Sequence, residues 1–263
     1  MNFKTVILFL VLILGCNQSK NEYRQDLMEI IDSTGYDGCF IVRSANTGKT
    51  IYVNQARVKF QFSPASTFKI PNSLIALQTR SVSSIHDTIR YNGIEKPVES
   101  WNRDHDLESA FKNSVVWYYQ DIAIRIGDTL MKKWLDTITD YGTMVRAGMI
   151  DNFWLDGSLV ISAEQQVNFL EKLYKSELPF SKEVMDTVKR MMLFEEGNGY
   201  KIYGKTGLSD RQKVGWFVGW IEKDKDTHIF ATNISYQDTL NINFQGTRVN
   251  LTKKMLNKLR ILN

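Results

Sequence analysis

The sequence is short of the two residue types on which most metal sites and disulfide frameworks depend. Its 263 residues include only two cysteines, Cys16 and Cys39, and three histidines, His86, His105 and His228. The histidines show neither HxxxH nor HxH spacing, whereas a structural zinc site usually takes four Cys or His ligands and a catalytic one about three protein ligands. We therefore expect neither a metal site nor a disulfide framework.

Other shortages argue against further classes of protein. Only four prolines accompany an aromatic fraction of 12%, which is not the composition of a disordered chain. No interval of about 20 to 50 residues recurs, which argues against a solenoid or propeller. Lys and Arg total 33 against 29 Asp and Glu without forming a dense basic cluster, so we expect no nucleic-acid partner. A hydrophobic fraction of 43% predicts one globular unit with a substantial core.

The N-terminal segment has the pattern of an export signal. A short positive start precedes the apolar run Thr5–Leu14, which is too short to span a bilayer core of about 30 Å comfortably. The end of this run, Leu14-Gly15-Cys16, resembles a bacterial lipoprotein signal, in which the chain is cleaved before the cysteine and the cysteine is lipidated. We expect an exported, periplasmic protein with residues 1–15 removed, one domain over 16–263, and membrane contact only through a lipid anchor on Cys16. An ordinary signal peptide or an uncleaved anchor is the alternative.

Hydrophobic periodicity predicts strands near both ends of the chain and helices in between. The expected strands are Cys39–Arg43, Thr50–Val53, Tyr200–Tyr203, Gly215–Glu222 and His228–Ser235, and the expected helices are Glu22–Ser33, Ser66–Leu77, Glu108–Ile126, Thr129–Thr139, Ala163–Tyr174, Lys182–Met192 and Thr247–Leu262. Short connections favour antiparallel pairing, so we expect an α/β (α+β) fold with a central antiparallel sheet flanked by helices. Residues of about 22–65 and 195–263 would form a sheet lobe, and about 66–194 an inserted all-helical lobe. Cys39, in its apolar run, is expected to be a buried structural thiol.

Ser66 and Lys69 lie three residues apart at the predicted N-terminus of a helix, after Pro64 and Ala65. Residues i and i+3 share one helix face, which places an amine beside a hydroxyl. A serine hydroxyl needs an adjacent base to become a nucleophile, and a lysine serves as that base only where burial or a neighbouring charge suppresses its own charge. The stretch from Ser109 to Lys112 has the same SxxK spacing inside a helical run, so the pattern alone indicates little.

A second short motif, Lys205-Thr206-Gly207, follows the predicted strand Tyr200–Tyr203. A glycine at this place would let a substrate backbone approach closely, whereas a plain strand-end turn would carry no chemistry. SxxK and K-[ST]-G occur together, in this order, in penicillin-binding proteins and serine β-lactamases.

With these motifs the chain resembles a class D (oxacillinase-type) serine β-lactamase of the penicillin-recognising serine enzyme superfamily. The resemblance covers essentially the whole body after the signal, and its motifs are Pro64–Asn72, Ser114-Val115-Val116, Tyr141-Gly142, Phe153-Trp154-Leu155 and Lys205-Thr206-Gly207. It implies a β-lactamase/transpeptidase-like fold and hydrolysis of the β-lactam amide of penicillin-type antibiotics, giving β-lactam resistance. The family usually has Asn where Thr143 stands, which puts the structural bonding of that residue in doubt.

The resemblance also implies a role for each motif residue. Ser66 would be the nucleophile, and Lys69, carboxylated on its amine by carbon dioxide, would be the general base of acylation and deacylation with no other cofactor. Ser114 would relay a proton to the leaving nitrogen, and Trp154 would hydrogen-bond the carbamate. Lys205 and Thr206 would face the substrate carboxylate and that relay. The substrate-binding residues would be Val116, Leu155, Thr206, Gly207, Leu208 and Arg248, with Phe68 as a further apolar wall and the backbone N–H groups of Ser66 and Leu208 as the oxyanion hole. Core packing is the alternative for Trp154, and a surface position on the last helix is the alternative for Arg248.

Two alternatives to hydrolysis stay open at this stage. A penicillin-binding D-Ala-D-Ala peptidase forms the same acyl-enzyme but deacylates β-lactams slowly. A β-lactam sensor domain binds covalently without turnover and is normally attached to transmembrane segments and a signalling domain. The Ser-Val-Val element and Trp154 argue against the peptidase. The sequence leaves the β-lactam spectrum, including carbapenems, and the oligomeric state open.

Overall fold

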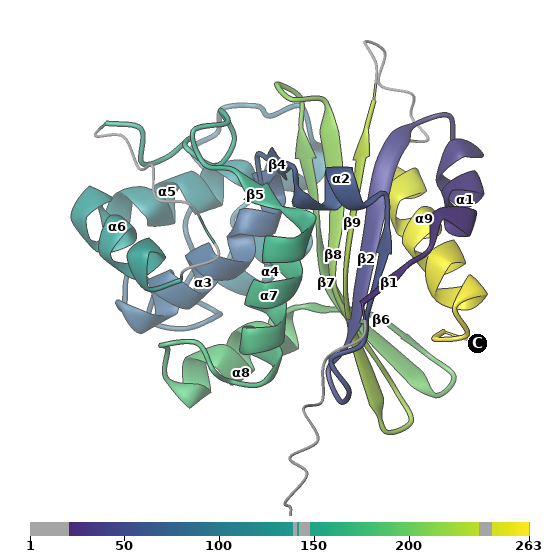
Figure 1. Cartoon of the computed structure of the whole chain (residues 1–263). Helices are drawn as coiled ribbons and strands as arrows, with labels where there is room; N and C mark the ends of the chain where they lie inside the picture. The colour runs from purple at the N-terminus through teal and green to yellow at the C-terminus, as the bar shows by residue number, and fades with distance from the viewer. Residues whose placement is uncertain (1–20, 139–140, 142–147, 237–243, 263) are drawn as a thin grey trace, which may run out of the picture.

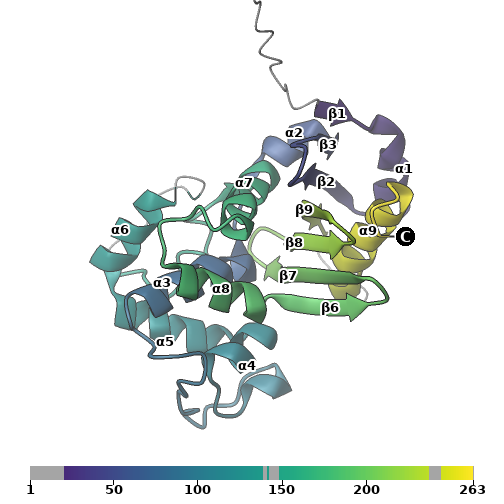
Figure 2. The ribbon, with the colours of Figure 1, turned by 90° about the horizontal axis from the view of Figure 1, so that it is seen from below.

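A computed structural model describes residues 21–138, 141, 148–236 and 244–262. These residues form three layers, in which a seven-stranded sheet lies between two helices on one face and a larger group of helices on the other (Figure 1). The two helices are α1 (Met28–Asp32) and α9 (Phe244–Lys258), which run side by side in both views (Figure 2). No helix within the described residues is long and apolar enough to cross a membrane.

The sheet has the strand order β1-β3-β2-β9-β8-β7-β6. Its strands are β1 (Asn21–Tyr23), β2 (Asp37–Ser44), β3 (Thr50–Val53), β6 (Leu193–Gly197), β7 (Tyr200–Ser209), β8 (Val214–Lys223) and β9 (Asp226–Ser235). All neighbouring strands are antiparallel except β1 and β3 at one edge, which are parallel. The expected central antiparallel sheet flanked by helices is therefore confirmed.

The larger helical layer holds most of the middle of the chain. Its α-helices are α2 (Gln55–Lys59), α3 (Lys69–Gln78), α4 (Leu107–Lys112), α5 (Val116–Ile126), α6 (Asp128–Thr137), α7 (Ala163–Tyr174) and α8 (Lys182–Met191). Short 3-10 turns occur at η1 (Gln25–Leu27), η2 (Ala65–Phe68) and η3 (Glu99–Trp101), and a small second sheet pairs β4 (Gln61–Phe62) with β5 (Ile161–Ser162). Here η2 and α3 matter most, because they carry Ser66 and Lys69.

Apolar side chains of the central strands point alternately to the two faces of the sheet, and both faces are buried. On β8, Trp216, Val218 and Trp220 pack into the core beneath the larger helical layer, whereas Phe217 and Ile221 pack into the core beneath α9. Successive strand residues point to opposite faces, so a continuous apolar run buries side chains on both sides. The sheet is thus a rigid two-sided scaffold, and Cys39 on β2 is fully buried within it, where burial raises the pKa of its thiol to about 12.

Several expected element boundaries were wrong. The N-terminal segment begins as β1 and forms only a short α1, not one helix over Glu22–Ser33. The expected strand Tyr200–Tyr203 extends to Ser209 and so contains the Lys205 motif, which is not a strand-end turn. The last helix occupies Phe244–Lys258 in place of Thr247–Leu262. Cys16 and Thr143 lie outside the described residues.

The single helix expected over Glu108–Ile126 is also wrong, because the chain breaks between α4 and α5 at Ser114. Ser114 has a φ of 56°, in the left-handed region that a helix interior does not allow. Apolar periodicity continues across the break, so the pattern gave no sign of it. The break turns Ser114 out of the helical register.

Strands β7 and β8 approach closely at a pair of glycines. A Cβ atom built on Gly219 would lie 1.9 Å from the carbonyl oxygen of Tyr203 and 2.7 Å from the Cα of Gly204. Gly204 and Gly219 are register partners, and Tyr203 stacks on Trp220 beside them with ring centroids 5.2 Å apart. The glycines therefore let the strand that carries Lys205 lie tightly against the centre of the sheet.

We expect Gly219→Ala to lower the free energy of unfolding by about 1–3 kcal/mol, because the added methyl overpacks rigid backbone. Thermal unfolding followed by circular dichroism would measure the loss. Gly246→Ala on α9 is the matched control, since its Cβ would lie 3.8 Å from the nearest recorded neighbour. That change should be neutral or should stabilise the helix by up to about 1 kcal/mol. Equal melting temperatures for both variants would contradict the close-approach argument.

Candidate active site

Ser66 and Lys69 meet where the turn η2 continues into α3. The Nζ of Lys69 donates a hydrogen bond to the Oγ of Ser66 over 2.9 Å. Ser66 is half-buried at the mouth of a cleft, whereas only 1% of Lys69 is exposed. The expected i, i+3 juxtaposition therefore exists, with the amine deep and the hydroxyl accessible.

The surroundings of Lys69 suppress its charge. Burial, and then the positive charge of Lys205, hold the pKa of Lys69 well below its usual value. The ring of Tyr119 lies 5.1 Å from Nζ, a wall that the sequence analysis missed. Of the expected walls, Phe68 is fully buried next to Lys69, while Val116 and Leu155 line the cleft. The amine is poised to be neutral and to accept a proton.

Trp154 packs against this group from the loop before β5. Its ring stacks on Phe68 with centroids 5.4 Å apart, and its side chain is fully buried. The indole Nε1 is also buried, yet it has no hydrogen-bond partner within the described part of the chain. Since buried donors are nearly always paired in native proteins, this N–H is suited to an acceptor that the polypeptide itself does not supply. Trp154 therefore packs in the core and also carries a buried donor without a partner among the described residues.

The other side of the site is built by β7 and the break at Ser114. The Nζ of Lys205 donates to the Oγ of Ser114 over 2.9 Å and to the carbonyl oxygen of Thr206 over 3.1 Å. Only 4% of Lys205 is exposed, and burial followed by the charge of Arg248 lowers its pKa to about 7. The left-handed backbone of Ser114 thus serves to bring its hydroxyl to a second lysine that is close to losing its proton near neutral pH.

Gly207 lies where β7, which carries Lys205, packs against the turn that carries Ser66. A Cβ atom there would lie 2.9 Å from the carbonyl oxygen of Pro64 and 3.2 Å from the backbone nitrogen of Thr67. The glycine therefore makes room for the turn that bears Ser66, and not only for a substrate as the sequence analysis suggested. The guanidinium of Arg248 donates to the carbonyl oxygen of Gly207 over 2.9 Å, which fixes the outer end of β7.

Arg248 belongs to the site and is not a surface arginine. Only 7% of it is exposed, and burial lowers its pKa to about 10. Its Nε is buried without a partner among the described residues, so donor capacity remains. Leu208 divides its contacts, since its side chain packs toward the α9 face while the residue also lines the cleft near Ser66.

One cleft of about 660 Å³ is lined by Ser66, Ser114 and the expected substrate-binding residues. It includes Ser66, Ser114, Val116, Leu155, Thr206, Gly207, Leu208 and Arg248, together with Pro97, Val98, Trp101, Asn113, Ser209, Asp210 and Arg211, which were not predicted. The additional residues lie largely on irregular segments, where periodicity carries no signal. The chain therefore brings together all the substrate-binding residues expected from the sequence.

Two other expected features lie outside this cleft. The second SxxK match borders a neighbouring cavity, where Ser109 closes the capping box of α4 with Asp106 and so already has a structural role. Tyr141 is buried, and its hydroxyl donates to Gln166, whose amide in turn donates to Thr67 beside the nucleophile. Tyr141 therefore contacts the site indirectly, through the hydrogen bonds that Gln166 makes to it and to Thr67.

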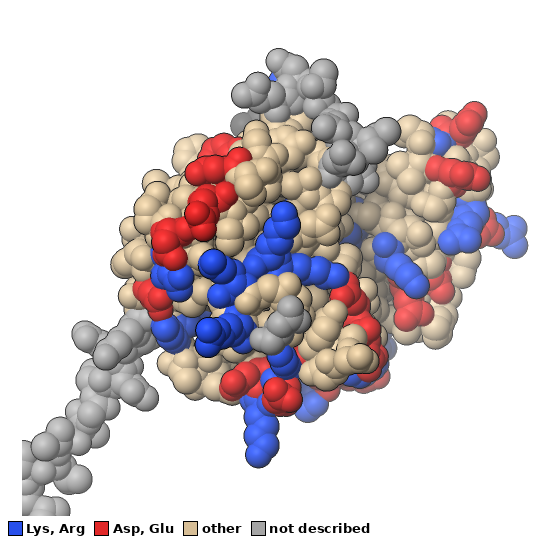
Figure 3. Space-filling model, turned by 90° about the vertical axis from the view of Figure 1, so that its right-hand side faces the viewer, with Lys and Arg blue, Asp and Glu red and all other residues tan. Residues whose placement is uncertain are grey.

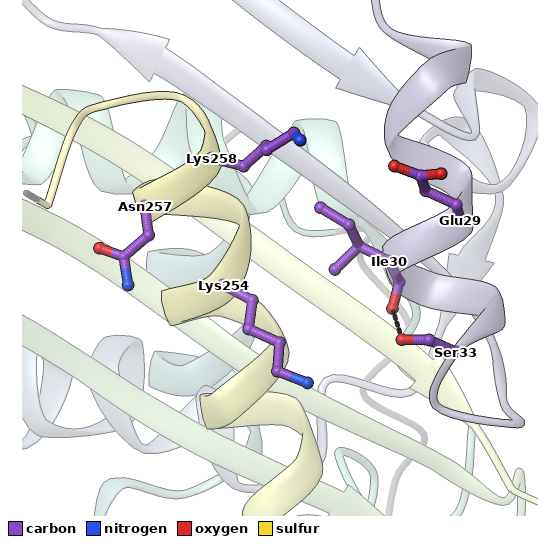
Figure 4. Close-up of a pocket in the computed structure, with 6 residues that line it drawn as sticks. All are labelled: Glu29, Ile30, Ser33, Lys254, Asn257 and Lys258. Atoms are coloured by element: carbon purple, nitrogen blue, oxygen red, sulfur yellow. Dashed lines mark hydrogen bonds between the residues drawn. The ribbon is translucent and has the colours of Figure 1, made fainter.

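A shallow hollow also occurs on the opposite side of the sheet, between α1 and α9. It is lined by Glu29, Ile30, Ser33, Lys254, Asn257 and Lys258 (Figure 4). Lysines and arginines are mixed with carboxylates over that face of the molecule (Figure 3). None of the residues expected in the site lies in this hollow, and the sheet separates it from Ser66.

Comparisons with known proteins agree with this geometry. Residues 38–256 match the family described as "Penicillin binding protein transpeptidase domain". The chain is 47% identical over 205 residues to "Probable beta-lactamase YbxI" of Bacillus subtilis, covering 77% of this chain and 76% of that protein. It is 40% identical over 227 residues to "Beta-lactamase OXA-48" of Klebsiella pneumoniae, covering 86% and 84%. The crystal structure of a class D beta-lactamase from Sebaldella termitidis superimposes with a TM-score of 0.88 at 31% identity, covering 93% of this chain and all of that one.

The buried charge of Lys205 leads to a prediction about stability. The unfolded chain keeps this proton up to a pH of about 10.4, whereas the native chain loses it near pH 7. The burial cost is therefore full below pH 7 and disappears as the pH rises toward 10. We expect Lys205→Met to raise Tm by roughly 2–4 °C at pH 6, with the gain shrinking by pH 9.5.

Scanning calorimetry at pH 6, 8 and 9.5 would measure both effects. The matched control is Lys132→Met on α6, where the side chain is 56% exposed, and its Tm should change little and equally at each pH. A Lys205→Met variant that melts below the parent at pH 6 would contradict the proposed burial cost.

Proposed function

Because this chain belongs to the class D β-lactamase family, we propose that it hydrolyses the β-lactam amide of penicillin-type antibiotics through a Ser66 acyl-enzyme, giving β-lactam resistance. The observation that carries the proposal is the hydrogen bond of 2.9 Å between Ser66 and a buried Lys69 whose pKa is well below its usual value. That pair supplies a nucleophile with a base already in contact with it. A D-Ala-D-Ala peptidase and a non-hydrolytic sensor are the alternatives that the first experiment below separates from it.

Acylation begins when the base at Lys69 takes the hydroxyl proton of Ser66 and the Oγ attacks the β-lactam carbonyl carbon. The backbone N–H groups of Ser66 and Leu208 are the proposed donors to the oxygen that becomes negative. The carbon–nitrogen bond of the ring then breaks, and the nitrogen receives a proton from Ser114. Lys205, in contact with the Ser114 hydroxyl and with a pKa of about 7, replaces that proton.

Deacylation completes the reaction with one water molecule. Before this step the base at Lys69 releases the proton it took from Ser66 and Lys205 is protonated again, so that both groups are back in their starting states. The base at Lys69 then takes a proton from the water, and the water oxygen attacks the carbonyl carbon of the Ser66 ester. The bond from that carbon to the Oγ of Ser66 breaks, the base returns its proton to the Oγ, and the acid product leaves with Ser66 restored. Throughout, Thr206 and Arg248 hold the substrate carboxylate, while Val116 and Leu155 provide apolar contact and keep the base dry. A guanidinium is well suited to such a carboxylate because it can form two parallel hydrogen bonds.

We propose in addition that Lys69 is carboxylated on Nζ by carbon dioxide, with no other cofactor. Three features of the described residues fit that group: a buried amine that is readily neutral, apolar walls, and the unpartnered indole N–H of Trp154. A carbamate supplies a carboxylate-like base that can serve both half-reactions. Trp154 would hold it by a hydrogen bond, and Phe68 would keep water away.

Export to the periplasm and lipidation at Cys16 are part of the same proposal. Support comes from the apolar run Thr5–Leu14 and the Gly15-Cys16 pair, which lie outside the described residues. A lipid on Cys16 would be the protein's contact with the membrane. Secretion is consistent with a cleft built for antibiotics that reach the cell from outside.

Residues 17–263 should hydrolyse nitrocefin with a sustained steady-state rate. Absorbance at the product wavelength would follow the reaction, and mass spectrometry would detect any acyl-enzyme. Ser66→Ala should lower the rate by at least about 1,000-fold, because the nucleophile is lost. A stoichiometric burst with no steady state would favour the sensor, and a burst with very slow release would favour the peptidase.

Protein preincubated at mildly acidic pH should regain activity when bicarbonate is added, since acid protonates Lys69 and only the neutral amine reacts with carbon dioxide. Nitrocefin rates across a bicarbonate titration would measure the effect. Lys69→Ala should gain nothing from bicarbonate and should be impaired in both acylation and deacylation. No response to bicarbonate, together with no added mass on Lys69, would leave the unmodified amine as the base.

A further inference from the structure

Ser63 is a fully buried residue whose three polar groups bind three different parts of the molecule. Its hydroxyl donates to the carbonyl oxygen of Trp154 over 2.7 Å. Its backbone N–H donates to the side-chain oxygen of Gln212, in the turn between β7 and β8, over 2.5 Å. Its carbonyl oxygen accepts from the indole of Trp216 on β8 over 2.8 Å. Ser63 therefore links three segments of the core through its hydrogen bonds, as buried polar groups usually do.

The bond to Trp154 joins two segments that the chemistry needs. The carbonyl oxygen of Trp154 also accepts the backbone N–H of Ala65 over 3.1 Å. Ala65 has a φ of 48°, an unfavourable backbone conformation for a residue with a side chain, and it directly precedes Ser66. The backbone of Trp154 is thus clamped by Ser63 and Ala65 against the turn that bears the nucleophile.

Ser63 itself stays away from the substrate. It does not line the cleft of Ser66, and its hydroxyl is used entirely by Trp154. Gln212, which accepts the backbone N–H of Ser63, also lies near the loop of Trp154, since its amide nitrogen would be 3.0 Å from a Cβ atom built on Gly157. The loop is thus held at the carbonyl oxygen of Trp154, while the indole N–H has no partner among the described residues.

We propose that Ser63 is a positioning residue, which holds Trp154 through its backbone so that the indole N–H can bind a carboxyl group on Lys69. The inference rests on the proposed function, since it assigns Ser63 to the carboxylation of Lys69. Without the Ser63 hydroxyl, the loop keeps only the Ala65 contact at that carbonyl, and the indole is less well placed. The carbamate is then less stable, although Ser66, Lys69 and Lys205 are unchanged.

The test is the bicarbonate dependence of Ser63→Ala. Carboxylation would be measured without turnover, as the carbamate signal in carbon-13 NMR of the protein titrated with carbon-13 bicarbonate, and in parallel as nitrocefin activity. Half-saturation should move to roughly three- to tenfold higher bicarbonate, the range expected when one hydrogen bond is lost. Activity at saturating bicarbonate should return close to that of the parent.

Thr232→Ala is the matched control, because Thr232 is also fully buried and its hydroxyl shares a hydrogen bond with that of Thr252 on α9, and neither residue lines the cleft. It should lower Tm and leave the bicarbonate titration unchanged. Ser63→Cys keeps the side-chain size with a much weaker donor, so it should shift the titration in the same direction even if Ser63→Ala folds poorly. In a Trp154→Phe background, Ser63→Ala should cause no further shift, because the indole N–H that Ser63 is proposed to position is already absent.

The outcomes separate this inference from the proposed function. A parent protein that turns over nitrocefin and shows the carbamate signal, with Ser63→Ala and Ser63→Cys titrating like the parent, would overturn the role of Ser63 alone. A parent with no carbamate signal would overturn the carboxylation of Lys69 and, with it, this inference. A shift of equal size in Thr232→Ala would reduce Ser63 to a general stabilising residue.

Discussion

The burial of one amine beside one hydroxyl is the constraint around which the molecule is arranged. A lysine held almost entirely out of water is costly to keep charged, so Lys69 gives up its proton far more readily than an exposed lysine does. That cost explains the aromatic residues around it, since Phe68, Tyr119 and Trp154 exclude the water that would restore the charge. It also explains the second lysine, because the positive charge of Lys205 disfavours a proton on Lys69.

The remaining parts of the site hold residues in conformations that they would not adopt alone. Ser114 and Ala65 both have left-handed backbones, and each is bound from another part of the chain. Such strain persists only where the surrounding structure over-determines it. The sheet provides that rigidity, because its two-sided core fixes β7, while Gly207 lets the Ser66 turn lie directly against it. Ser114, Ala65 and Gly207 therefore contribute by fixing the positions of the site residues.

How much of this the sequence could predict depended on the range of each interaction. The spacing of Ser66 and Lys69 was predictable because residues three apart on a helix share one face, and α7 was predicted with its observed bounds because its apolar residues recur with the helical period. The break at Ser114 was not predictable, since apolar periodicity runs through it and the left-handed residue that ends α4 is a serine and not the usual glycine or asparagine. Tyr119 and Ser63 were missed for another reason: their partners lie 50 or more residues away and leave no local pattern.

The order of the strands has a consequence for how the chain folds. β2 pairs with β9 over eight positions, from Asp37 with Ser235 to Ser44 with His228, so the first and last parts of the chain meet at the middle of the sheet. Closing so long a loop is entropically slow, and β-rich pairings of this kind dominate folding times. An N-terminal portion emerging from synthesis would hold Ser66 and Lys69 in sequence but could not yet keep the amine dry. The low pKa of Lys69 thus depends on a sheet whose central pairing joins the two ends of the polypeptide.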